Sequence, residues 1–121
     1  MIKAKAAHGI FSAGHDLNEL TSAHEIVNDP MFAMFNAIYS TAIPVIAQVN
    51  GTVYAGALHL LMVCDMAFAT ADAKVVITAN KMGVPFSLRN YQKWLSVMGV
   101  HKIKELFYAA SPTTALAAYH A

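Results

Sequence analysis

The sequence has little charge and a single cysteine. Of its 121 residues, 12% are charged and 57% are hydrophobic, and the formal net charge is +1. Because lysine and arginine form no cluster, we expect neither nucleic acid nor an anionic membrane surface as a partner. Cys64 has no second cysteine to pair with, which excludes an internal disulfide and is typical of a reducing compartment.

Membrane spans, a signal peptide and metal-binding spacings are also lacking. The longest apolar stretch, 55–71, contains His59 and Asp65 and is too short and too polar to cross a bilayer. The start, MIKAKAAHGIF, has no signal-peptide core, so the cytoplasm is the predicted location. The six histidines are not spaced as metal ligands, and we predict no metal site.

The apolar pattern predicts one domain, over 1–121, in which strands and helices alternate. IPVIAQVN (43–50) is apolar on nearly every residue, which predicts a strand buried on both faces, as in a parallel sheet, with Pro44 at its start. Strands are also predicted at 2–6 and within 65–78, where two flank a turn at 71–73. Helices are predicted from Pro30, over 55–63, over 87–98 with Gly99 at the end, over 100–110, and from Ser111-Pro112. No internal repeat is visible, and the order of elements predicts an α/β fold.

The helix predicted over 100–110 has an apolar face that should be buried. That face consists of Val100, Ile103, Leu106, Phe107 and Ala110.

Two glycine-containing bends are the places where the backbone itself could take part in chemistry. They are Ala13-Gly14-His15-Asp16 and Ala55-Gly56-Ala57. The start of a helix presents unpaired N–H groups, and a glycine lets a ligand approach them closely. Two such donors aimed at one point would form an oxyanion hole for a carbonyl that becomes an enolate. The alternative is that Gly14 and Gly56 serve only turns and packing.

Four blocks of the chain together resemble the crotonase (enoyl-CoA hydratase/isomerase) superfamily in order and spacing. They are FSAGHDLNEL, IPVIAQVNGTVYAGALHLLMVCDMAFATADAKVVI, MGVPF and KELFYAASPTTALAAYHA. FSAGHDLNEL, GVPF and ASPTTA are most similar to the methylmalonyl-CoA decarboxylase group of that superfamily. The resemblance implies part of a ββα spiral, the ClpP/crotonase fold, without its first strands and its C-terminal helical region. It also implies an acyl-CoA thioester as ligand, with no cofactor beyond coenzyme A itself.

The resemblance assigns roles to individual residues. The N–H groups of His15 and Gly56 would be the two oxyanion donors, and Ser12 and Ala13 would lie beside the adenine of coenzyme A. Since the donors belong to the main chain, the His15 side chain is not required for that role.

The chain also departs from the superfamily pattern. Hydratases use two glutamates, and His59 and Ala79 occupy those positions here. Because hydration requires an acid and a base, ordinary hydratase chemistry is disfavoured. Phe86 stands where the decarboxylase-like pattern has a tyrosine after GVP, so the tyrosine hydroxyl is missing as well.

Some side chains could still carry acid–base or binding roles. His59 lies one helical turn after Gly56 and is a candidate base; the alternative is a packed helix histidine. Asp16 and Glu19 are acid–base candidates, with a helix cap and a solvated face as their alternatives. The predicted substrate-binding residues are Ser12, Ala13, Asp16, Tyr54 and Phe86, with core packing as the alternative for Tyr54. Cys64 and the methionine and aromatic residues of 31–39 are predicted to be packing residues.

Two functions therefore remain open. One is an enzyme that stabilises a thioester enolate through a backbone oxyanion hole, with lyase or isomerase chemistry. The other is a non-catalytic fragment of the crotonase fold that binds a partner or assembles with itself. The high apolar fraction predicts a homo-oligomer in either case. The resemblance implies a trimer or a multiple of it, and exchange of elements between subunits would give a domain-swapped dimer.

Overall fold

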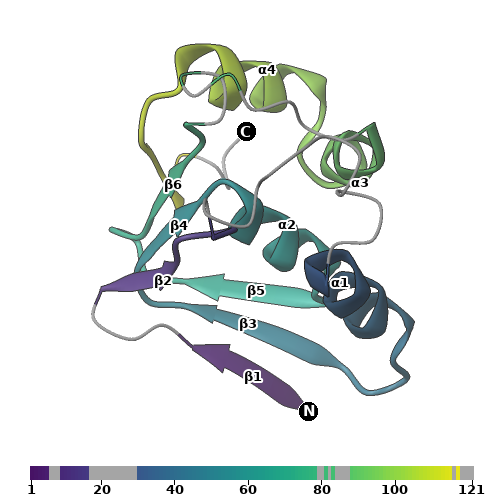
Figure 1. Ribbon diagram of the computed structural model, residues 1–121. Helices are drawn as coiled ribbons and strands as arrows, with labels where there is room; N and C mark the ends of the chain where they lie inside the picture. The colour runs from purple at the N-terminus through teal and green to yellow at the C-terminus, as the bar shows by residue number, and fades with distance from the viewer. Residues whose placement is uncertain are drawn as a thin grey trace.

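A computed structural model describes residues 1–5, 9–16, 30–78, 81, 83, 88–115 and 117 of the chain. Helices and strands are interspersed along this part of the chain, as the sequence predicts for an α/β fold (Figure 1). In chain order they are β1 (Ile2–Lys5), β2 (Ile10–Ser12), α1 (Pro30–Ser40), β3 (Val45–Val49), β4 (Thr52–Tyr54), α2 (Gly56–Val63), β5 (Met66–Ala69), β6 (Lys74–Val76), α3 (Leu88–Met98), α4 (Val100–Ala109) and β7 (Thr113–Thr114).

The described strands form two sheets, and the chain passes between them in a regular order. One sheet has the order β1-β3-β5 and is parallel throughout. The other has the order β2-β4-β6-β7, and its first three strands are parallel. Each strand of the first sheet is followed by a strand of the second and then by a helix. The structure therefore repeats a strand–strand–helix unit, although no repeat is visible in the sequence.

The central strand β3 is buried on one face only. Val45, Ala47 and Val49 are buried, whereas Ile46 is half-buried and Gln48 is exposed. The prediction of a strand covered on both faces is therefore wrong. In the described part of the chain, α1 and α2 lie over one face of the sheet β1-β3-β5, and its other face is open (Figure 1).

The hydrophobic core joins the second sheet and the buried face of β3 to α2, α3 and α4. Its largest fully buried side chains are Trp94, Phe107, Leu58, Ile77, Leu106 and Val53. Of the apolar face predicted for α4, Ile103, Leu106, Phe107 and Ala110 are buried. Val100, the first residue of α4, is 46% exposed, so the prediction that it is buried is wrong.

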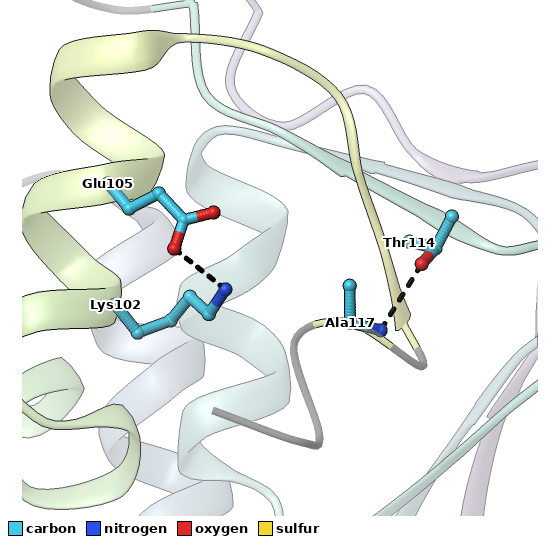
Figure 2. A network of polar contacts seen from close by, with 4 residues as sticks. All are labelled: Lys102, Glu105, Thr114 and Ala117. Carbon is cyan, nitrogen blue, oxygen red and sulfur yellow. Dashed lines mark hydrogen bonds and ion pairs between the residues drawn. The ribbon is translucent and has the colours of Figure 1, made fainter.

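The segment after α4 differs from the prediction. Thr113 and Thr114 form β7, which pairs antiparallel with β6, so the last helix does not begin at Ser111-Pro112; helical backbone is described only after β7, at Ala115 and Ala117. β-branched residues favour strands, and the edge of β6 offers backbone groups for pairing. The Thr114 hydroxyl accepts a hydrogen bond from Ala117 N (3.2 Å), which turns the chain after β7 (Figure 2).

Candidate active site

The two glycine bends, which are far apart in the sequence, contact each other in the structure. Gly14 has a φ of +88°, and a Cβ built on it would lie 3.0 Å from the Tyr54 carbonyl oxygen and 3.2 Å from Gly56 N. Parallel pairing of β2 with β4 brings the ends of these strands together, and both bends follow directly. Gly14 is therefore required both for its backbone conformation and for the close approach of the two segments.

Gly56 is a glycine for a different reason. It is the first residue of α2, and its φ lies outside the left-handed region. A Cβ on Gly56 would lie 3.5 Å from Met31 Cε and 3.7 Å from His15 N, which are ordinary contact distances. The folded chain would accept a side chain here. Because Gly56 has no side chain, there is space beside the backbone nitrogen of His15.

The start of α2 is held by backbone contacts. Ala55 N donates to the Val76 carbonyl oxygen (2.9 Å), and Leu58 N donates to the Ala55 carbonyl oxygen (3.0 Å). Ala55 has φ 39° and ψ −110°, and none of the described side chains caps this helix. Among the backbone hydrogen bonds between described residues outside the regular elements, none has the Gly56 N–H as its donor. The positive end of the α2 dipole is therefore directed at the space beside Gly56.

The predicted binding residues before α1 lie around the first bend. Ser12 ends β2, and its hydroxyl accepts a hydrogen bond from Gly14 N (3.2 Å), which shapes the bend. His15 is half-buried, whereas Ala13 and Asp16 are exposed. Of this bend, Gly14 and the backbone nitrogen of His15 are the parts that approach Gly56.

Tyr54 ends β4, is half-buried, and contacts the first bend through its carbonyl group. Phe86, Glu19 and Ala79 lie outside the described residues. The binding role predicted for Phe86 and the acid–base role predicted for Glu19 therefore stay predictions.

His59 is buried in an aromatic environment. Its Nδ1 accepts a hydrogen bond from Trp94 Nε1 (3.0 Å), and its ring lies 4.6 Å from the ring of Phe35. Burial, and then the nearby Lys93 ammonium, lower the pKa of His59 from 6.5 to about 4. A neutral imidazole that accepts at Nδ1 carries its proton on Nε2, so no lone pair remains to take up a substrate proton. These contacts favour the packed-histidine alternative over the base role.

Met31 lies beside Gly56, a position that the sequence analysis, which assigned Met31 to packing, did not predict. The first turn of α1 places its thioether end beside Gly56, where a Cβ on Gly56 would meet Met31 Cε at 3.5 Å and Met31 Sδ at 3.6 Å. No local signal distinguishes Met31 from the packing residues of the same helix, because its position depends on how α1 docks on α2.

Burial, and then the charge of Asp65, raise the pKa of the Cys64 thiol, which agrees with an inert packing role.

The described residues contain no cluster of three His, Cys, Asp or Glu side chains placed to hold a metal ion. Likewise, none of the helices in the described ranges is long and apolar enough to span a membrane.

Two sheets wound by a strand–strand–helix repeat, with two backbone bends meeting at the start of a helix, define a spiral protein of the mixed α/β class. The chain belongs to the Enoyl-CoA hydratase/isomerase family, which matches residues 4–120. This confirms the family predicted from the four sequence blocks.

Methylmalonyl-CoA decarboxylase of Escherichia coli K12 is 32% identical over 118 residues, which are 95% of this chain and 45% of that protein. The mitochondrial methylglutaconyl-CoA hydratase of Rattus norvegicus is 30% identical over 106 residues, 84% of this chain and 34% of that protein. The chain thus spans less than half the length of these relatives.

Solved structures of the same family also match this chain over about half of their own length. A structure of methylmalonyl-CoA decarboxylase in complex with 2-nitronate-propionyl-CoA superposes with a TM-score of 0.90 at 33% identity, over 98% of this chain and 48% of that one. The predicted α/β fold, as part of a longer crotonase fold, is therefore confirmed.

Proposed function

We propose that this chain binds an acyl-CoA thioester and stabilises its enolate through the backbone N–H groups of His15 and Gly56. The observation that carries the proposal is the contact between the two bends, since His15 N lies 3.7 Å from the position of the missing Gly56 side chain. If both N–H groups are directed at this space, one carbonyl oxygen can accept from both. In such sites the loss of one donor lowers kcat by about 10² to 10³-fold.

The ligand class is supported by the relatives. Methylmalonyl-CoA decarboxylase has been solved with 2-nitronate-propionyl-CoA and with 2S-carboxypropyl CoA, and both are coenzyme A derivatives. On this chain, Ser12, Ala13 and Asp16 would bind the coenzyme A portion, while Tyr54, Phe86 and Met31 would line the acyl end. Lyase or isomerase chemistry fits better than hydration, because His59 is held as a neutral packing residue.

A pair of ligands that differ only at the carbonyl tests this proposal. Acetyl-CoA has the thioester oxygen, whereas S-ethyl-CoA is a thioether without it. We expect calorimetry to show tighter binding of acetyl-CoA, and thermal unfolding to shift upward with its concentration. A ligand at a hundredfold excess over Kd stabilises the folded state by about 2.7 kcal/mol. Equal affinities for the two ligands would reject the oxyanion site.

A second candidate function is self-assembly without catalysis. Met66 and Phe68 of β5 are 46% and 61% exposed and lie on the same sheet as β3. Exposed apolar side chains of this kind favour association, as a trimer, a multiple of it, or a domain-swapped dimer. This candidate predicts oligomers and no turnover with a panel of acyl-CoA thioesters. A stable monomer at micromolar concentration in light scattering would reject it.

For the location, we propose the cytoplasm. The proposal is supported by the single cysteine, because an unpaired thiol is typical of reducing compartments. Fractionation of the producing cells tests it, and recovery from a secreted fraction would contradict it.

A further inference from the structure

A buried polar pair joins α2 to α3 close to the candidate site. The indole Nε1 of Trp94 donates to His59 Nδ1 at 3.0 Å. Trp94 is fully buried and His59 is 5% exposed, so water cannot replace either partner. Breaking the bond would leave one buried polar group unsatisfied. The pair therefore holds the two helices in one relative position.

Side chains of α1 also pack around this pair, so the contacts of the pair connect α2 to α1 as well. The rings of Phe35 and Phe32 lie 4.6 and 6.5 Å from the His59 ring. Lys93 is the charged group near His59, and its ammonium lies 4.7 Å from the ring centre of Tyr39 on α1. Apolar rings can slide past one another at little cost, whereas a hydrogen bond between buried groups prefers one distance and one direction. Of the contacts around His59, the bond to Trp94 is thus the most specific in position.

This specificity matters because the start of α2 has few local restraints. Gly56 is three residues before His59, which is one helical turn. No described side chain caps the helix, and Ala55, which precedes Gly56, has a sparsely populated backbone conformation. The direction of the Gly56 N–H therefore depends on how α2 as a whole is held.

We propose that His59 and Trp94 are positioning residues for the Gly56 amide: their hydrogen bond fixes α2 so that this N–H points at the thioester oxygen. The inference rests on the proposed function, because it assigns the pair to the same site. It differs from the base role expected from the sequence, since neither side chain touches the substrate.

The test compares the ratio of acetyl-CoA to S-ethyl-CoA affinity among variants of the protein. His59→Leu removes the acceptor and Trp94→Phe removes the donor, whereas His59→Asn keeps an acceptor near the position of Nδ1. Ile103→Ala is the matched control, because Ile103 is a buried residue of α4 that makes no hydrogen bond to the pair. We expect the ratio to fall about fivefold in His59→Leu and Trp94→Phe, as for the loss of one hydrogen bond. His59→Asn and Ile103→Ala should retain it.

A purely structural role would weaken both ligands equally and leave the ratio unchanged in all variants. That result, together with a normal preference in the unmodified protein, would overturn the positioning role and leave the proposed function intact. If the unmodified protein shows no preference, both the oxyanion site and the inference fail. Should His59→Leu not fold, Trp94→Phe and His59→Asn decide the comparison.

Trp94 also offers a spectroscopic readout, because it is the only tryptophan of the chain. Its indole N–H gives a single resonance in a ¹H–¹⁵N spectrum. We expect this resonance to lie downfield in the unmodified protein, to move upfield in His59→Leu, and to shift on addition of acetyl-CoA but not of S-ethyl-CoA. An indole resonance that responds equally to the two ligands, or to neither, would contradict coupling between the pair and the amide.

Discussion

Gly14 and Gly56 lie against each other in the site, but only Gly14 has a positive φ. An alanine at position 14 would have to adopt φ +88° and would bring its Cβ within 3.0 Å of the Tyr54 carbonyl oxygen. We therefore expect Gly14→Ala to lower the free energy of unfolding by about 2 kcal/mol or more. Urea unfolding measures this, and an unchanged midpoint would show that the two bends do not meet as described.

Gly56→Ala should behave in the opposite way. The added methyl has room, and replacing glycine at a compatible position stabilises a protein by about 0.4 to 1 kcal/mol. The same methyl would occupy the space beside His15 N, so we expect acetyl-CoA binding to weaken by about tenfold or more. A stable variant that still prefers acetyl-CoA over S-ethyl-CoA would show that this space is not the ligand site.

His59 should make stability depend on pH. Its pKa is lowered to about 4 in the folded state, mainly by burial, against 6.5 in an exposed histidine. Above pH 6.5 both states are neutral and stability is complete. Between pH 6.5 and about 4 only the unfolded state gains the proton, so stability falls as the pH is lowered, by about 3 kcal/mol in total.

Urea unfolding at a series of pH values from 7.5 to 4.5 measures this slope. His59→Asn has no titrating group at this position and should lose the His59 part of the pH dependence. The same slope in both proteins would show that another group causes it.

At the scale of elements, the start of α2 contains a strained backbone position. Ala55 has φ 39° and ψ −110°, a conformation that glycine adopts more readily. We expect Ala55→Gly to raise the free energy of unfolding by about 1 kcal/mol. Ala57→Gly, in the helical part of α2, is the matched control and should lower it by about 1 kcal/mol. If both variants are destabilised alike in urea, Ala55 carries no strain.

The local pattern was sufficient for most elements. The helices from Pro30, over 55–63, over 87–98 and over 100–110 correspond to α1 to α4, and Gly99 separates the last two. The pattern failed at β7, because Thr113 and Thr114 pair with a strand almost 40 residues away. The pattern failed at β3 as well. Apolar residues on both faces of this strand predict that both faces are buried, but burial of the second face requires another layer of structure against the sheet.

At the scale of the whole molecule, the open face of the sheet β1-β3-β5 should control association. Phe68 is 61% exposed, so Phe68→Lys should leave folding stability nearly unchanged. We expect this variant to lower the apparent mass in light scattering at micromolar concentration. Tyr108→Lys is the control: Tyr108 is 77% exposed on α4, away from this sheet, and its replacement should have no effect. Equal association of the two variants would show that the sheet face is not the contact surface.

The sequence by itself determined the α/β class, the helices, and the family, because apolar periodicity, glycine and proline positions and short motifs are local properties. It also singled out both glycine bends. Only the tertiary structure decided that Gly14 and Gly56 touch, that Met31 lies beside them, and that His59 binds Trp94. These contacts join residues from separate elements, and their distances depend on how strands pair and helices dock, which no local pattern encodes.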